Sequence, residues 1–110
     1  MSVEAALQEF TEKMEKNPEH IEDLTYTYEF RITDEKEGIY QLRIDQGKAE
    51  YSSSAQWEPK LVMEMKEEYF QKLANDDLNA TMAYMSGKLK IKGDVSHALK
   101  FQSLIKKYQN

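Results

Sequence analysis

The first third of the chain changes from a helical to an alternating pattern of apolar residues. Apolar side chains recur at helical spacing over residues 3–14, with glutamates between them, which predicts an amphipathic helix packed on one side. The helix should end near Pro18, because the residue before a proline disfavours the helical region. Over residues 24–33 apolar and polar residues alternate strictly, which is typical of a strand with an aromatic buried face.

Strand patterns continue through the middle of the chain. A charged turn at residues 34–38 precedes a second alternating stretch, whose buried face carries Leu42 and Ile44. A third strand should follow near residues 48–52, and three strands joined by short turns predict an antiparallel meander. After a polar loop, residues 61–66 alternate again and predict a fourth strand.

The last third of the chain is divided by polar and glycine breaks. Acids followed by apolar residues predict a helix that begins near Glu67. Asn79 can cap the next short helix, which Gly87 ends. Residues 88–92 alternate like a fifth strand, and Asp94 is the natural cap of a long final helix.

Composition limits the function classes. A length of 110 residues predicts that residues 1–110 form one domain. The chain has no cysteine, which excludes disulfides and favours a reducing, cytoplasmic location. Neither the charged start MSVEAALQEF nor the end KKYQN reads as a signal peptide or a peroxisomal address. The formal net charge of -5, without an arginine cluster, argues against nucleic-acid binding.

The polar residues form no enzyme constellation. His20 and His97 lie on different expected elements, and for His97 a local contact with the cap of the last helix is the simplest interpretation. The serines at 52–54 lack an identifiable base, and the acidic turns lack calcium-loop spacing. We therefore expect no catalytic residue, no metal site and no cofactor.

Two segments carry a family resemblance: MSGKLKIKGD at residues 85–94 and ALKFQSLI at residues 98–105. Both closely resemble the sterol carrier protein type 2 lipid-binding family. The resemblance implies an α+β fold with a five-stranded sheet, helices mainly on one face, and a hydrophobic tunnel between sheet and helices. It also implies lipid binding without a catalytic centre.

The expected tunnel lining combines the apolar strand faces with methionines, because methionine adapts to irregular space and varied ligands. Ordinary core packing is the simpler interpretation of any one of these residues. The full set is Tyr26, Tyr28, Phe30, Ile32, Leu42, Ile44, Met63, Met65, Phe70, Met82, Met85, Leu99 and Gln102.

Gln102 is the polar exception on the broad apolar arc of the last helix. A buried amide without partners costs roughly 1–3 kcal/mol, so it must find hydrogen bonds. The simpler account is a bond to neighbouring backbone. The resemblance places its counterpart at the tunnel and favours a polar contact for a ligand head group.

Lysines gather near the C-terminus, with six against Asp94 alone over residues 88–110. The simpler interpretation of Lys88, Lys90 and Lys92 is an edge strand protected by charge. The functional interpretation adds Lys100, Lys106 and Lys107 and gives a patch that meets anionic membranes transiently.

We expect the chain to bind and transfer or present fatty acyl chains, sterol-like molecules or other hydrophobic ligands, as a monomer, with a dimer left open. Two rivals remain. One is a protein-interaction or accessory module whose apolar groove receives a partner protein. The other is a small enzyme, which would need His97 or a carboxylate facing the tunnel with a supporting partner.

Overall fold

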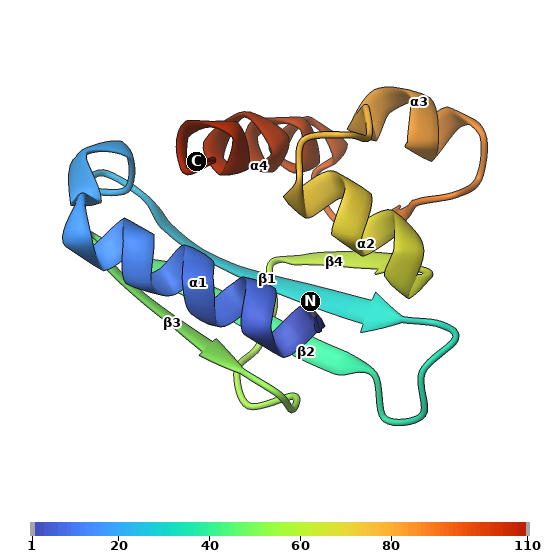
Figure 1. The fold of residues 1–110 in the computed structure, drawn as a ribbon, viewed down its shortest axis with the longest axis horizontal. Helices are drawn as coiled ribbons and strands as arrows, with labels where there is room; N and C mark the ends of the chain where they lie inside the picture. Colours follow the sequence, from blue (N-terminus) through green and yellow to red (C-terminus); the bar gives the residue numbers. More distant parts are fainter. Residues whose placement is uncertain (1, 110) are drawn as a thin grey trace.

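A five-stranded sheet of strand order β3-β2-β1-β4-β5 forms the centre of the molecule, in a computed structural model that describes residues 2–109 (Figure 1). The strands are β1 (Thr25–Ile32), β2 (Ile39–Asp45), β3 (Lys48–Ser52), β4 (Leu61–Met65) and β5 (Lys90–Lys92). β1, β2 and β3 form the expected antiparallel meander, and β4 and β5 also pair antiparallel. β1 and β4 run parallel, which places the first strand in the middle of the sheet.

The helices gather over one face of this sheet, as Figure 1 shows. They are α1 (Val3–Lys16), α2 (Glu67–Ala74), α3 (Ala80–Met85) and α4 (Val95–Lys107), with a short 3-10 turn, η1 (Pro18–His20), between α1 and β1. α1 packs on β3 and β2, whereas α4 packs on β4 and β5 and also carries α3. The expected α+β architecture is therefore confirmed. None of the helices within residues 2–109 is long and apolar enough to cross a membrane.

Side-chain caps fix where three of the helices begin. The Ser2 hydroxyl accepts from the backbone N–H of Ala5 at 3.0 Å and starts α1. Asn79 and Asp94 cap α3 and α4 in the same way, at 3.0 and 2.9 Å from the backbone nitrogens that they accept from. Each cap satisfies a backbone donor that the helix leaves unpaired, which is why short polar residues mark these positions.

The core lies between the inward face of the sheet and the helices. On β1 the residues Tyr28, Phe30 and Ile32 are at most 3% exposed, as the alternating pattern predicts. α1 buries its apolar stripe, from Val3 to Met14, against the neighbouring strands. Burial of these faces removes apolar surface from water and is the main stabilising term of the fold.

The opposite face of the sheet is partly covered by the loop over residues 53–60. Gln41 of β2 is fully buried on this face, and its Oε1 accepts from the backbone N–H groups of residues 56–57 at 2.9 and 2.8 Å. Its Nε2 donates to the carbonyl of Trp57 at 2.8 Å and to Glu29 at 2.9 Å. One amide therefore fastens the loop that carries the chain from β3, at the edge, to β4.

Gly93 offers a test of the turn between β5 and α4. It has a φ of 122°, and an added Cβ would lie 2.8 Å from the backbone oxygen of Lys60. Gly93→Ala should therefore lower the free energy of unfolding by about 2–4 kcal/mol, through strain plus a clash. Gly87 has a φ of 81° but open space around its Cβ position, so Gly87→Ala should cost only about 1 kcal/mol. Urea unfolding of both variants measures the difference, and equal losses would contradict the steric argument.

Candidate functional site

An aromatic cluster joins the sheet to two helices. The ring of Phe30 on β1 lies 5.4 Å from Phe70 of α2 and 5.4 Å from Phe101 of α4, measured between centroids. Tyr28 lies 4.6 Å from the same Phe101 ring. All four side chains are at most 3% exposed. Phe101 therefore packs α4 directly against the central strand.

A small apolar void lies beside this cluster, where α1, α2 and α4 meet. Its volume is about 10 Å³. Its lining consists only of apolar residues: Leu7, Phe10, Phe70, Leu73, Ala74, Phe101 and Ile105. A space of this size holds about one water molecule, and water needs polar partners that this lining lacks. A void of this size is too small to hold a lipid chain, and the open tunnel implied by the resemblance stays a prediction.

The structure brings together most, but not all, of the expected lining. The residues buried between sheet and helices are Tyr28, Phe30, Ile32, Leu42, Ile44, Met63, Met65 and Phe70. Tyr26 is half-buried at the end of the same face. In contrast, Met82 and Met85 are 70% and 80% exposed, and Leu99 is 36% exposed. These three side chains lie outside the core, and a ligand-binding role for them stays a prediction.

The exposure of the methionines follows from how α3 packs. This six-residue helix buries Ala80 and Ala83, each 1% exposed. Met82 and Met85 share the same three-residue spacing and therefore lie together on another side of the helix. Helical periodicity alone could not show that α3 would bury its small residues and expose its large ones.

Six residues of the void lining were not among the expected site residues: Leu7, Phe10, Leu73, Ala74, Phe101 and Ile105. The apolar stripes of α1 and α4 were visible in the sequence as packing faces. Their meeting point was not visible, because it depends on how three helices cross. Phe101 lies within the ALKFQSLI segment, which was the available signal.

The amide of Gln102 binds protein backbone. Its Oε1 accepts from the N–H of Ala80 at 2.9 Å, and its Nε2 donates to the carbonyl of Leu78 at 2.9 Å. Both ends of the amide are thus used to fasten the start of α3 to α4. The favoured interpretation, a polar contact for a ligand head group, gives way to the simpler account.

Gln102→Leu should therefore destabilise the fold. The substitution leaves two backbone groups at the start of α3 without their partner, at a cost of about 2 kcal/mol or about 8 °C in melting temperature. Gln8→Leu, on the exposed side of α1, is the matched control and should change stability by less than about 0.5 kcal/mol. Thermal unfolding measures both, and an unchanged melting temperature for Gln102→Leu would show that the amide does not hold α3.

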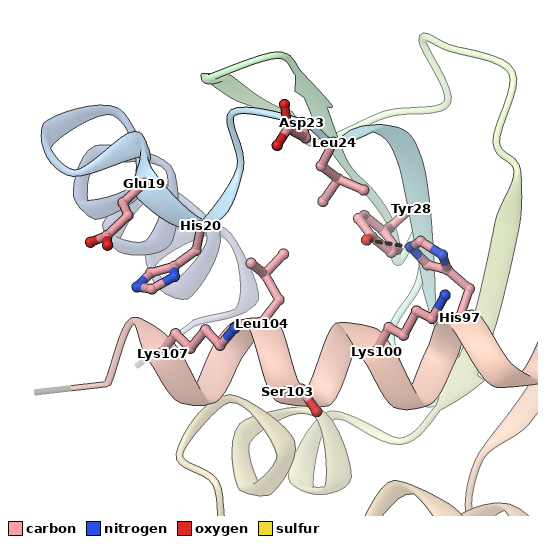
Figure 2. A pocket seen from close by; sticks show the side chains of 10 residues that line it. All are labelled: Glu19, His20, Asp23, Leu24, Tyr28, His97, Lys100, Ser103, Leu104 and Lys107. Atoms are coloured by element: carbon pink, nitrogen blue, oxygen red, sulfur yellow. Dashed lines mark hydrogen bonds between the residues drawn. The ribbon is translucent and has the colours of Figure 1, made fainter.

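A second, amphipathic groove of about 360 Å³ runs along α4 (Figure 2). Its lining is Glu19, His20, Asp23, Leu24, Tyr28, His97, Lys100, Ser103, Leu104 and Lys107. The His97 Nε2 lies 2.8 Å from the hydroxyl of Tyr28, and the imidazole stacks on Tyr26 with a centroid distance of 3.5 Å. The backbone of His97 makes the expected local contact, because its N–H donates to the carbonyl of Asp94 at 3.0 Å. Its side chain reaches across to β1, which the sequence did not predict.

Electrostatics favours the neutral forms of this pair. Burial, followed by the nearby charge of Lys100, lowers the pKa of His97, although Asp94 acts in the opposite direction. Burial raises the pKa of the Tyr28 hydroxyl. A neutral tyrosine–histidine pair at this position packs α4 against β1. Within residues 2–109, no three His, Asp or Glu side chains lie close enough to hold a metal ion.

The lowered pKa of His97 predicts a pH dependence of stability. The unfolded chain takes up this proton near pH 6.5, whereas the folded protein takes it up only at lower pH. The contribution of neutral His97 to the free energy of unfolding is thus fully present above about pH 6.5. It is lost as the pH falls through the lowered pKa of the folded state. Melting temperatures between about pH 7.5 and pH 5 should fall less steeply for His97→Gln than for the parent chain. Parallel curves would contradict the assignment.

Comparison with known sequences gives one family. The sequence model of the SCP-2 sterol transfer family matches residues 4–106. Hydroxysteroid dehydrogenase-like protein 2 from Danio rerio is 34% identical over 93 residues, which cover 81% of this chain and 22% of that protein. The protein of the same name from Rattus norvegicus is 37% identical over 83 residues, covering 71% of this chain and 15% of that one. The chain thus spans about a fifth of the length of such relatives, 22% for the Danio rerio protein.

Solved structures share the fold. The sterol carrier protein domain 2 of Helicoverpa armigera has a TM-score of 0.67 and 24% identity, covering 93% of this chain and 84% of that one. Palmitated SCP2L2 from Aedes aegypti has a TM-score of 0.67 and 20% identity, covering 96% and 95%. A structure described as UbiJ-SCP2, a ubiquinone synthesis protein, has a TM-score of 0.74 and 12% identity, covering 94% and 88%.

Proposed function

Because the chain belongs to the SCP-2 sterol transfer family, we propose that it is a non-catalytic lipid-binding domain that receives its ligand between the sheet and helices α1, α2 and α4. Membership of this family supports lipid binding or transfer in general. The ligand class proposed is a fatty acyl chain, a sterol-like molecule or another hydrophobic molecule. A cytoplasmic location and a monomeric state remain predictions.

The apolar void where the three helices meet is the observation that carries this proposal. All of its lining residues are apolar, and the atoms that face the void lack packing partners on that side. An acyl chain that enters here gains about 0.8 kcal/mol for each buried methylene. That gain must exceed the cost of separating α2 and α4 around Phe70 and Phe101. The flexible side chain of Met63, which pairs with Phe30 across the sheet, would adapt to the ligand at low cost.

Ala74→Leu tests the position of the ligand. Ala74 lines the void and is 8% exposed, so the larger side chain occupies the space that an acyl chain would enter. We expect the affinity for palmitate to fall by on the order of tenfold, or about 1.4 kcal/mol. Ala5→Leu adds the same atoms on α1, away from the void lining, and should bind palmitate like the parent chain. A folded Ala74→Leu variant with unchanged affinity would place the ligand elsewhere.

Native mass spectrometry of freshly purified protein tests whether a lipid is bound at all. Retained lipid, identified after extraction, would support the carrier function. Protein that is free of lipid and does not take up palmitate from solution would contradict it, whatever the behaviour of the Ala74 variant. The palmitated form of the Aedes aegypti neighbour supports palmitate as the first probe.

A protein-interaction module is the second candidate, and one observation favours it. The core is densely filled, while Met82, Tyr84 and Met85 present 70%, 42% and 80% of their surface to solvent. A closed core with an exposed apolar patch is typical of an interaction site. The match to about a fifth of a longer dehydrogenase-like protein, 22%, also supports presentation of lipid to an enzyme. Lipid binding remains the better supported function, because it rests on the family as well as on the void.

A further inference from the structure

The end of the molecule formed by α3, β5 and the start of α2 carries a cationic pocket outside the lipid site. It measures about 370 Å³. Its lining is Thr33, Glu64, Met65, Lys66, Tyr69, Ser86, Gly87, Lys88 and Lys90. Three lysines thus face one acid. Such an excess is unusual on a chain whose formal net charge is -5.

The charges of these lysines are not compensated. Within residues 2–109, Lys66, Lys88 and Lys90 have no carboxylate oxygen within 4.0 Å. The single acid of the pocket, Glu64, lies 3.4 Å from both Arg31 and Lys92, so its charge is already shared between two other cations.

Other acids lie close to this pocket without lining it, among them Asp34, whose carboxylate accepts from the backbone N–H of Glu67 at 3.0 Å. Glu67 and Glu68 follow Lys66 on the first turn of α2, but neither of them lines it. Between Asp77 and Asp94 the chain contains no acidic residue at all. The lining itself thus holds three lysines and one acid, an excess of positive charge that an anion can balance.

Tyr69 gives the pocket one wall. The ammonium group of Lys88 lies 5.6 Å from the centre of its ring, and that of Lys72 lies 6.0 Å from it. Gly87 has no heavy atom within 4 Å of its Cβ position, so this side of the pocket is open. A tetrahedral anion such as a phosphate group can approach the lysines from there.

Within residues 2–109, the two most exposed large apolar side chains lie next to this pocket along the chain. Met85 immediately precedes the lining residue Ser86, and Met82 is one helical turn earlier on the same side of α3. They are 80% and 70% exposed, respectively. A bilayer surface has phosphate groups above hydrocarbon. Exposed methionine side chains next to lysines without a carboxylate partner are complementary to both layers.

We propose that this end of the molecule docks on anionic phospholipid membranes, with a head-group phosphate among Lys66, Lys88 and Lys90 and with Met82 and Met85 inserted beside it. The occupant follows from charge complementarity: the three unpaired cations attract the anionic surface, and the methionines add burial that a soluble phosphate could not supply. A six-residue helix that exposes its long apolar side chains reaches the interface without unfolding the core.

The test is sedimentation with vesicles of phosphatidylcholine, with and without phosphatidylserine, using protein free of any lipid ligand. The parent chain should bind only the anionic vesicles and should be released between about 0.05 M and 0.5 M salt, since screening shortens the reach of these charges. The triple variant Lys66→Gln, Lys88→Gln, Lys90→Gln should bind about a hundredfold more weakly, at about fivefold for each lysine. No binding by the parent chain to anionic vesicles at low salt would overturn the proposal.

A matched control separates this site from net charge. The triple variant Lys16→Gln, Lys36→Gln, Lys48→Gln lowers the net charge by the same three units, and none of these exposed lysines lines the pocket. It should keep vesicle binding within about twofold to fivefold of the parent chain. An equal loss in both triple variants would refute the site.

A second pair of variants tests the methionines. Met82→Gln with Met85→Gln should weaken binding by on the order of tenfold, whereas Met82→Leu with Met85→Leu should not weaken it. Equal vesicle binding by the glutamine pair and the leucine pair would contradict the insertion of Met82 and Met85 into the bilayer. If inorganic phosphate perturbs the amide signals of Ser86 and Gly87 while vesicles do not bind, the pocket is a site for a soluble anion and the membrane proposal fails.

These outcomes are independent of the lipid-binding proposal. The pocket and the apolar void share no lining residue. The affinity of the lysine variants for palmitate in solution should therefore equal that of the parent chain. Loss of vesicle binding with retained palmitate binding identifies the docking end, whereas vesicle binding that the lysine variants retain would overturn the proposal, whatever their affinity for palmitate.

Discussion

The central position of β1 is the constraint on which the rest of the structure depends. β1 has a neighbour on each side, and its inward residues Tyr28 and Phe30 are at most 1% exposed. Because β4 pairs with it in parallel, the chain must travel from β3 at one edge, across the outer face, to the far side of β1. The buried amide of Gln41 stabilises this path, because it hydrogen bonds both the N–H and the carbonyl of Trp57. Without the loop, this amide would be buried with fewer partners.

The inward face of β1 also sets the conditions for ligand binding. Phe101 of α4 contacts both Tyr28 and Phe30, so the last helix is held by the same strand that organises the sheet. These rings border an apolar void of only about 10 Å³ where α1, α2 and α4 meet. In the proposed function, lipid competes with aromatic packing, which makes affinity depend on how easily α2 and α4 separate.

α3 is held at its two ends by hydrogen bonds to neighbouring segments. Gln102 fastens its start to α4, and the carbonyl of Ala83 accepts from the backbone of Lys88 and Leu89 at its end. The helix therefore stays in place while its methionines lie outside the core. The alanines of α3 are buried, at 1% exposure each, whereas Met82 and Met85 remain exposed.

The sequence by itself determined the elements, their order, the caps at Asn79 and Asp94, and the family, because local periodicity, capping chemistry and a contiguous motif all act between near neighbours. It also indicated which face of each strand is buried. Only the tertiary structure decided that β1 and β4 run parallel, that His97 reaches Tyr28, and that Gln102 holds α3 instead of facing a ligand. Each of these depends on residues more than twenty positions apart, as in the separations of 69 for the histidine contact and 24 for the amide. Such pairs form only when the helices pack across the sheet at particular angles, and the pattern of apolar and polar positions does not specify those angles.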